Sequence, residues 1–463
     1  MRPIDHLVTT RIARLDPRAR RALFRAVEDA ERAVALFHRH RAGGRPVPHP
    51  IALTPFLVPR PLMPTLARLA DCIHRLQTRA PALYQAGDAG LRAACPLSQA
   101  TARWLALGGR PVPWALMIRP DVGLTGDRGQ GLPRPVLFET NATALAGLYN
   151  HTAGAAILRH EVFPRLLSAR ERRRLGEPPD LLALTVRWVL RAARRLGCRR
   201  RLGVAFLEEA APVAGYSEIP RLIRAFAAAG LRAAQGTPED LRLRRGEVYL
   251  GDMRVDLAYR DLAYDDLGPP PARGRRLAGF RALLARGAVL PDFAGEFAHK
   301  GLLERLTAPA HARLFRPAER RLLAACIPWT RVLSARFTDG PDGRRVDLPE
   351  YARRRRAALL IKPNLGSSGE GILLGCETPA ARWEARLARA LREPGRWVVQ
   401  ERRPGARRPM VYLRDGAAYA GACYSSLGLF YAPGDLGLHC RVSRAPIVNV
   451  ARGGALACAF LAR

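Results

Sequence analysis

A lysine stands where an apolar segment runs into a loop rich in glycine and serine. Residues 359–363 are apolar apart from Lys362 and Pro363. The loop that follows holds Gly366, Ser367, Ser368, Gly369 and Gly371. Glycines let backbone N–H groups approach a phosphate closely, and a lysine supplies a compact positive charge for it. The pattern is neither a Walker A loop nor a dinucleotide fingerprint. It indicates phosphate contact, and an ordinary β-hairpin turn is the alternative.

Lysine is nearly absent from the chain. Lysine and arginine total 76, yet only Lys300 and Lys362 are lysines. Ammonium and guanidinium groups differ in shape and in hydrogen bonding, so we expect the two lysines where arginine cannot substitute. Together they can hold the phosphates of a nucleotide from two separate elements. Lys300 lies where a helix is expected to begin, so an exposed helix residue is its alternative interpretation.

Two strand-forming segments carry acidic and amide side chains. Glu139 and Asn141 are two residues apart, so on a strand they project from the same face. Asp121 and Arg119 lie on the preceding strand-forming segment, which is expected to pair with theirs in a hairpin. Carboxylate and amide oxygens suit Mg²⁺, and an arginine can neutralise a phosphoryl group in transfer. The alternative is a polar strand edge with an Arg–Glu pair.

Composition limits the class of protein. The chain has 463 residues, enough for about two to four domains with large buried cores. A hydrophobic fraction of 48% and a charged fraction of 25% exclude a mainly disordered, collagenous or coiled-coil protein. The net charge is +36, but the arginines are spread along the whole chain. We interpret this charge as the composition bias of a GC-rich genome, with an arginine-based nucleic-acid binder as the alternative.

The spacing of the cysteines and the length of the apolar segments indicate the cellular compartment of the protein. The eight cysteines show no C-x-x-C spacing and no nearby histidine pairing that suggests zinc. They are expected to be free thiols in a reducing compartment. The N-terminal segment lacks the apolar core of a signal peptide, and no stretch approaches the roughly 18 apolar residues of a membrane helix. We therefore expect a cytoplasmic protein with no membrane partner.

The apolar patterning predicts an α/β protein. Residues 1–110 are expected to be mostly helical, with helices near 18–39, 64–79 and 88–107. Two strands joined by a polar loop are expected between residues 112 and 145. Strands and helices alternate over about 200–290, and residues 293–325 read as helical. A strand, glycine loop and strand follow over 357–375.

Six short motifs occur in a distinctive order. They are R-P-D at 119–121, F-E-T-N-A at 138–142, A-H-K-G-L-L at 298–303, I-K-P-N-L-G-S-S-G-E-G-I at 361–372, V-V-Q-E at 398–401, and R-V at 441–442 with N-V-A-R-G-G at 449–454. This order resembles the circularly permuted ATP-grasp proteins, which include the glutathionylspermidine synthetase-like ligases. In that group the E-x-N element precedes the lysine–glycine loop, as it does here. The resemblance covers about residues 112–455, and D-x-x-Y-R at 256–260 is similar to a segment of the family's pre-ATP-grasp-like subdomain.

The resemblance implies roles by position. The implied magnesium ligands are Asp121, Glu139 and Asn141. The residues implied to contact the nucleotide are Lys300, Lys362, Gly366, Ser367, Ser368, Gly369, Gly371, Gln400, Glu401 and Asn449. Among them Gln400 and Glu401 match the hinge that reads adenine and ribose. Arg119 matches an arginine near the transferred phosphate, and Arg441 one near an acyl phosphate.

The implied activity is ATP-dependent ligation of a carboxylate to an amine through an acyl phosphate, with release of ADP and phosphate. ATP and Mg²⁺ are the implied cofactors, and an amino acid, peptide or polyamine the implied small-molecule substrates. Residues 141–145 lack the aspartate that follows E-x-N in the glutathionylspermidine members, and no amidase domain is appended, so their specificity is not implied. The alternatives are a catalytically degenerate ATP-grasp binding protein and a basic nucleic-acid-binding protein.

These expectations divide the chain into four parts. They are an N-terminal helical region at 1–110, an ATP-grasp lobe with the metal-binding hairpin at 111–195, a pre-ATP-grasp-like α/β subdomain at 196–295, and a nucleotide-binding ATP-grasp lobe at 296–463. His151, His299 and His439 lie near the motifs. We interpret them as ordinary structural histidines, with a general base among them as the alternative.

Overall fold

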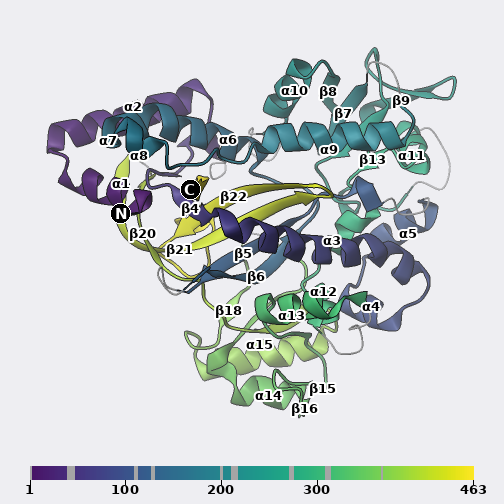
Figure 1. Ribbon diagram of the computed structural model, residues 1–463. Helices are drawn as coiled ribbons and strands as arrows, with labels where there is room; N and C mark the ends of the chain where they lie inside the picture. The colour runs from purple at the N-terminus through teal and green to yellow at the C-terminus, as the bar shows by residue number, and fades with distance from the viewer. Residues whose placement is uncertain are drawn as a thin grey trace.

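The computed structural model confirms the α/β class. It describes residues 3–38, 47–108, 113–126, 131–198, 202–209, 217–270, 276–307, 314–366, 369–414 and 416–462. A central sheet has helices on both sides, and two further α/β lobes lie beyond it, one around β7 and one around α15 (Figure 1). No helix in these described ranges is long and apolar enough to cross a membrane. All eight cysteines are free thiols, as expected.

Seven strands form the central sheet, in the order β20-β3-β23-β22-β21-β5-β6. They are β3 (Ile51–Ala52), β5 (Arg119–Thr125), β6 (Arg134–Asn141), β20 (Arg408–Arg414), β21 (Ala417–Ala432), β22 (Asp435–Ser443) and β23 (Ala455–Ala457). Strand β20 also pairs with β21. The five strands β20, β3, β23, β22 and β21 therefore form a closed ring in which each pairs with the next and the last pairs with the first. Helix α3 (Met63–Gln85) packs on β21, and α9 (Leu181–Arg195) packs on β22 from the opposite face (Figure 1).

The predicted hairpin is the β5–β6 pair. Its register sets Arg119 opposite Asn141 and Asp121 opposite Glu139. Beyond Asp121 the pairing shifts, because Val122 lies opposite Leu137 and Phe138 is the extra residue of a β-bulge. A bulge re-aims the side chains beside it. Residues 127–130 of the connection lie outside the described part of the chain.

The N-terminal region is helical over most of its length. Its helices are α1 (Ile4–Arg14), α2 (Pro17–Ala33), α3, α4 (Ala89–Ala94) and α5 (Gln99–Leu107). Helix α2 ends at Ala33, earlier than the predicted limit near residue 39. The single helix predicted over 88–107 is wrong. Pro96 lacks an N–H group, and the Ser98 hydroxyl accepts a hydrogen bond from the Thr101 N–H to start a new helix, α5.

Four short strands in this region were missed. Strands β1 (Phe37–His38) and β2 (Val47–Pro48) pair with each other in antiparallel orientation. Strand β3 pairs with β20 and β23, and β4 (Phe56–Pro59) runs parallel to β24 (Ala459–Ala462). The segment 51–58 is a short apolar run with no local mark of strand structure, and its partners are more than 350 residues away along the chain. The two ends of the chain therefore pack together (Figure 1). The four-part division of the chain stays a prediction.

The lobe around β7 confirms the predicted alternation. Its parallel sheet has the order β13-β12-β7-β8. The strands are β7 (Gly203–Leu207), β8 (Arg232–Gly236), β12 (Leu257–Arg260) and β13 (Val289–Leu290), with α10 (Ile219–Ala228), α11 (Ala278–Ala285) and the hairpins of β9 (Leu241–Arg244), β10 (Glu247–Leu250) and β11 (Met253–Arg254) beside them. Arg260 ends β12 fully buried, with an ion pair of 2.7 Å to Glu296. This part of the D-x-x-Y-R segment therefore has a structural role.

The third lobe carries the glycine loop. Its sheet has the order β14-β19-β17-β18. The elements are β14 (Thr330–Val332), β15 (Phe337–Asp339), β16 (Arg345–Asp347), α14 (Leu348–Arg354), β17 (Leu359–Pro363), β18 (Leu373–Leu374), α15 (Ala380–Arg392) and β19 (Trp397–Glu401). The predicted strand–loop–strand is the antiparallel β17–β18 pair. Trp329, Trp383 and Leu387 help to fill the core of this lobe.

The segment predicted as helical over 293–325 is helical but interrupted. It contains η7 (Phe293–Phe297), α12 (Leu302–Thr307) and α13 (Pro317–Cys326), and residues 308–313 lie outside the described ranges. Between β6 and α9 the chain forms α6 (Leu148–Ile157), η3 (Leu158–Val162), α7 (Phe163–Leu166) and α8 (Ala169–Arg172). The turn between η7 and α12 holds Lys300 beside the β17 lobe.

Candidate functional site

A cavity of about 650 Å³ lies where the β5–β6 hairpin meets β17 and β19. Many of the residues singled out in the sequence line it, although they come from segments far apart in the chain. These residues are Arg119, Asp121, Glu139, Asn141, Lys362, Gly369, Gln400, Glu401, Arg441 and Asn449. The fold therefore brings cations, carboxylates and amides from five segments into one concave site, the usual form of a small-molecule site.

Lys362 reaches the cavity from β17. Its ammonium donates hydrogen bonds to the Phe138 carbonyl oxygen at 2.6 Å and to Oε1 of Gln400 at 2.8 Å. The pKa of Lys362 is lowered to about 7, mainly by burial and also by the charge of Lys300, against the opposing effect of Glu139. The Lys362 side chain is therefore close to half-protonated at neutral pH, and an approaching anion would favour its charged form.

Lys300 is not among the residues that line the cavity, but from the turn before α12 its side chain reaches Glu139, which does line it. Its Nζ lies 3.3 Å from Oε2 of Glu139 and donates a hydrogen bond of 2.9 Å to the carbonyl oxygen of Gly366, at the start of the glycine loop. The two lysines thus converge on the bulged segment of β6. Lys300 contacts the Glu139 side chain, and Lys362 contacts the backbone of Phe138, one residue earlier.

Asn364 fixes the turn that carries Lys300. Its Oδ1 accepts a hydrogen bond of 2.7 Å from the Gly301 N–H, and its carbonyl oxygen accepts one of 2.8 Å from the Lys300 N–H. Its amide group donates to the carbonyl oxygens of Ala94 at 2.8 Å and Gly395 at 2.7 Å. The side chain is buried, so no water replaces these bonds. Asn364 therefore ties α4, α12 and the β17 lobe together.

Replacing Asn364 by alanine is expected to lower the free energy of unfolding by about 2 kcal/mol, because it leaves one buried N–H and two buried carbonyl groups without their partner. Urea denaturation measures this loss. Asn449→Ala is the matched control, because the Asn449 side chain accepts one hydrogen bond, from the Ala451 N–H, at a more open position. Equal losses in the two variants would contradict the role given to Asn364.

Asp121 lies between two arginines. Its Oδ1 is 3.0 Å from Nε of Arg119, and its Oδ2 is 2.7 Å from Nη2 of Arg441. The Asn141 amide also donates to Oδ2, at 3.2 Å. Burial raises the pKa of Asp121, but the charges of Arg119 and Arg441 outweigh it and hold that pKa below its usual value. Asp121 therefore stays ionised and positions both arginines along the cavity wall.

The predicted magnesium ligands are unequal in this arrangement. Both oxygens of Asp121 already contact guanidinium groups. Glu139 is more open, with 24% of its side chain exposed. The amide nitrogen of Asn141 donates a hydrogen bond to Asp121, so the other polar atom of that side chain, the amide oxygen, is the one that could bind a cation. These two oxygens suit a hard cation. The described residues contain no group of three or more His, Cys, Asp or Glu side chains arranged for a metal. Asp121 as a third ligand stays a prediction.

The hinge pair contacts its own neighbours. The Gln400 amide accepts from Lys362 and donates to Oγ1 of Thr330 at 2.8 Å, so it orients the lysine. The Glu401 carboxylate pairs with Arg403 at 2.8 Å. Both residues line the cavity. They lie on β19, which pairs with β17 at the centre of the sheet of this lobe. Their predicted contact with adenine and ribose stays a prediction.

The glycine loop has the backbone that its composition predicts. Gly369 and Gly371 have φ values of +69° and +70°, which L-residues with a Cβ rarely adopt. A Cβ on Gly369 would also lie 2.5 Å from Ile447. Of the loop residues that the structure describes, only Gly369 lines the cavity, while Gly366 accepts a hydrogen bond from Lys300. Ser367 and Ser368 lie outside the described residues.

The three histidines fall into two groups. Burial lowers the pKa of His151 and of His299 to about 4, which fits the structural interpretation of both. His439 differs because it lines the cavity, where Gly147 packs so closely that a Cβ there would lie 2.8 Å from its ring. Burial, with the charges of Arg441 and Arg119, holds the pKa of His439 well below its usual value. His439 is therefore a neutral imidazole in the wall of the site.

Some wall residues were not foreseen from the sequence. The backbone carbonyl of Phe138, the Thr330 hydroxyl, Ser425 and Ser426 of β21 and the segment 446–448 complete the contacts around the predicted residues. A serine pair in an apolar strand gives a weak signal, and a carbonyl group gives none, because only the bulge turns it toward Lys362.

Comparison with models of known protein families finds no match for this sequence, and comparison with curated proteins finds none. Comparison with solved structures finds the apo form of a glutathione synthetase-like effector, GSS30, from Globodera pallida. It has a TM-score of 0.68 at 12% identity and covers 96% of this chain and 98% of that one. A candidate gamma-glutamylcysteine synthetase from Methylobacillus flagellatus KT has a TM-score of 0.41 at 12% identity, covering 84% of this chain and 88% of its own, which is too weak to define a shared fold.

The chain therefore has a mixed α/β fold that it shares with this glutathione synthetase-like effector. That the shared fold is of the ATP-grasp type stays a prediction. The circularly permuted order of its motifs stays a prediction.

Proposed function

We propose that this protein is an ATP-dependent ligase that joins a carboxylate to an amine. The observation that carries the proposal is the convergence of the two lysines, from separate elements, on Phe138 and Glu139 at one cavity. Arg119 and Arg441 add two more cations to the same wall. The likeness of the fold to a glutathione synthetase-like protein supports the same class.

The residues present fit a magnesium nucleotide. Lys300, Lys362 and the N–H groups of the glycine loop would hold its phosphates, since Lys362 is a buried cation whose present partners are neutral. Glu139 and Asn141 offer oxygens that would hold Mg²⁺, and the bound ion would supply positive charge between the phosphates. Arg119 and Arg441, held by Asp121, would face the phosphoryl group in transfer.

The proposed reaction has two steps. A substrate carboxylate oxygen attacks the γ-phosphorus of ATP, the bond to the β-phosphate oxygen breaks, and ADP leaves. The amine nitrogen then attacks the carbonyl carbon of the acyl phosphate, the C–O bond to phosphate breaks, and the amine proton passes to solvent. Closure of the glycine loop would exclude the water that hydrolyses such an intermediate.

Calorimetric binding of a non-hydrolysable ATP analogue with Mg²⁺, at moderate salt, tests the site. We expect saturable binding of one nucleotide per chain. Turnover with pairs of amino acids, peptides and polyamines is then expected to release ADP. Release of AMP and pyrophosphate would overturn the acyl-phosphate route. Binding without turnover for any pair would favour the degenerate ATP-grasp alternative, and absence of nucleotide binding would overturn the proposal and direct attention to nucleic acids.

The affinity for the nucleotide is expected to fall as the pH rises above 7. The pKa of Lys362 is lowered to about 7 in the free protein, and a bound polyphosphate needs its charged form. Binding at pH 8 must therefore take up close to one proton, and Kd is expected to rise about tenfold per pH unit between pH 8 and pH 9. Calorimetry at pH 8 in two buffers of different ionisation enthalpy measures the proton uptake. Equal affinity at pH 7 and pH 9 without proton uptake would contradict this role of Lys362.

A further inference from the structure

A second cavity, of about 710 Å³, lies between α4, α12, β14 and the β15–β16 hairpin. None of its lining residues lines the first cavity. Its charged lining residues are Arg92, Arg305, Arg331, Arg336 and Arg345 with Glu304 and Asp339. Five cations against two carboxylates make this pocket strongly positive, and none of these residues has a part in the proposed reaction.

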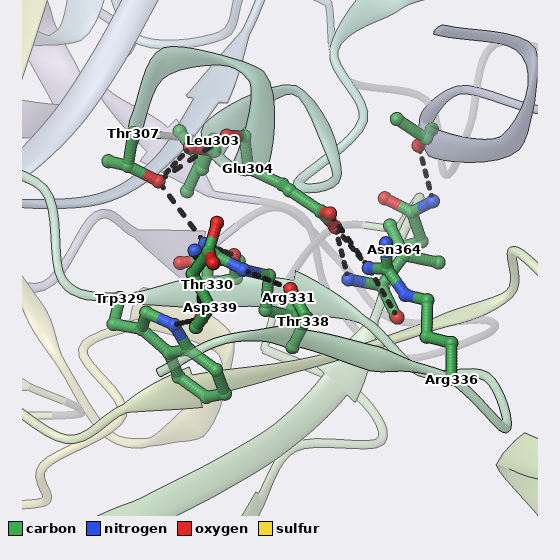
Figure 2. A network of polar contacts seen from close by, with 12 residues as sticks. Leu303, Glu304, Thr307, Trp329, Thr330, Arg331, Arg336, Thr338, Asp339 and Asn364 are labelled. Atoms are coloured by element: carbon green, nitrogen blue, oxygen red, sulfur yellow. Dashed lines mark hydrogen bonds and ion pairs between the residues drawn. The ribbon is translucent and has the colours of Figure 1, made fainter. Parts of the chain in front are cut away.

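Arg331 is a buried cation whose hydrogen bonds go only to neutral oxygens, and its guanidinium lies 5.2 Å from the ring centre of Trp329 (Figure 2). Its Nε donates to the Thr338 hydroxyl at 3.0 Å, and its Nη atoms donate to the carbonyl oxygens of Thr330 at 2.8 Å and Asp339 at 3.1 Å. It has no ion pair with any residue in the described part of the chain, and burial lowers its pKa. A buried charge without a counter-charge is costly. The pocket thus holds a buried cation that has no ion-pair partner among the described residues, although the charges of Glu304 and Asp339 partly offset the effect of its burial.

Two carboxylates near the pocket, Glu304 and Asp88, already have arginine partners. Both oxygens of Glu304 contact Arg336, at 2.7 and 2.8 Å, and one of them also accepts from the Val332 N–H (Figure 2). Arg305 pairs with Asp88 at 2.6 Å, outside the pocket lining. The Nε atoms of Arg305 and Arg336 are buried without a hydrogen-bond acceptor. Glu304 and Asp88 are therefore each occupied by one arginine, and Asp339 is the remaining carboxylate of the lining against Arg92, Arg331 and Arg345.

The rim of the pocket adds a cation and an aromatic ring. The Arg345 guanidinium lies 4.8 Å from the ring centre of Phe337 and has no ion pair with any other described residue. The Phe337 side chain is 60% exposed, unusually open for a large apolar residue. Arg92, on α4, also lines the pocket, and its guanidinium lies 5.3 Å from the ring centre of Tyr84. Guanidinium groups bind carboxylates and phosphates through paired hydrogen bonds, so this rim suits an anion.

We propose that this pocket is a second ligand site, for a small anion that carries at least two negative groups, either phosphoryl or carboxyl. Its volume lies in the range of ligand pockets, about 300–1,000 Å³. The concave arrangement of the arginines favours a compact ligand over a nucleic acid, which needs a stripe of cations along a surface. Ala94 and Gly395 line the pocket and also accept the amide hydrogen bonds of Asn364, so the site lies directly behind the turn of Lys300.

Calorimetric titration with pyrophosphate and with citrate tests the proposal and separates the two sources of charge. The main variant is Arg92→Glu/Arg345→Glu, at two exposed rim positions. Its matched control is Arg344→Glu/Arg382→Glu, which changes the net charge equally at exposed positions outside the pocket lining. Arg331→Gln removes the charge at the floor and keeps hydrogen-bonding capacity. Lys300→Ala/Lys362→Ala removes phosphate contacts at the first cavity.

We expect a saturable site for at least one of the two anions. Its affinity should fall at least tenfold in Arg92→Glu/Arg345→Glu and in Arg331→Gln, and stay within twofold of wild type in the control and lysine variants. Equal weakening in both charge-reversal variants would show diffuse surface attraction and overturn the proposal. Loss in the lysine variant alone would place the anion in the first cavity and also overturn it. The pocket site stands if the arginine variants alone lose the anion, even where no ATP analogue binds the wild type.

Discussion

The Lys300→Ala/Lys362→Ala variant is expected to bind the Mg²⁺ complex of a non-hydrolysable ATP analogue at least a hundredfold more weakly than wild type. Hydrogen bonds between charged groups contribute about 1.5–3 kcal/mol each, so loss of both lysines removes about 3–6 kcal/mol of binding free energy. Both ammonium groups reach the same bulged segment of β6, so a phosphate chain placed there contacts both. Calorimetry measures the loss.

Folding and net charge need separate controls in this test. Without Lys362, the Phe138 carbonyl and Oε1 of Gln400 lose a donor, so circular dichroism and urea denaturation must show that the variant is folded. Arg344→Ala/Arg382→Ala removes the same charge from exposed positions away from the cavity and is expected to bind like wild type. A loss below fivefold in the folded lysine variant would mean that the lysines do not hold the nucleotide.

The main candidate residues could be selected from the sequence because the composition of the chain isolates them, although their roles stay predictions. Where nearly every basic residue is arginine, the two lysines stand out, and the structure brings both of them to Glu139 and its neighbour. Alternation along a strand also placed Glu139 and Asn141 on one face, and both line the cavity. These inferences need only residue types and local spacing.

Pairing between distant residues was not predictable. The sequence predicts Asp121 as a metal ligand, but Arg441, 320 residues later, shares its carboxylate with Arg119. The bulge at Phe138 depends on the register of two strands, and no residue in the segment marks it. Strand β3 was missed for the same reason, since its partners lie in the last sixty residues of the chain. Local propensity cannot specify contacts that form only when distant segments meet.

Replacing Asp121 by asparagine is expected to lower the free energy of unfolding by about 3–5 kcal/mol, because it leaves Arg119 and Arg441 with charges that nothing nearby neutralises. Asp121 is 2% exposed, so water cannot take the place of its carboxylate. Urea denaturation at pH 7.5 measures the change. Glu139→Gln is the matched control, since its ion pair with Lys300 is longer, at 3.3 Å, and partly exposed, and its expected cost is below about 1 kcal/mol.

The pH dependence of the stability of wild type and of Asp121→Asn distinguishes the loss of the Asp121 charge from a disturbance of packing. The pKa of Asp121 is lowered in the folded protein, so its ion pairs stabilise the fold fully above the unfolded value of about 3.9 and lose that effect as the pH falls through the folded value. The difference in stability between wild type and Asp121→Asn should therefore be constant from pH 5 to pH 8 and shrink below about pH 4. A difference that persists unchanged at pH 3 would show that asparagine disturbs packing, and that Asp121 does not act through its charge.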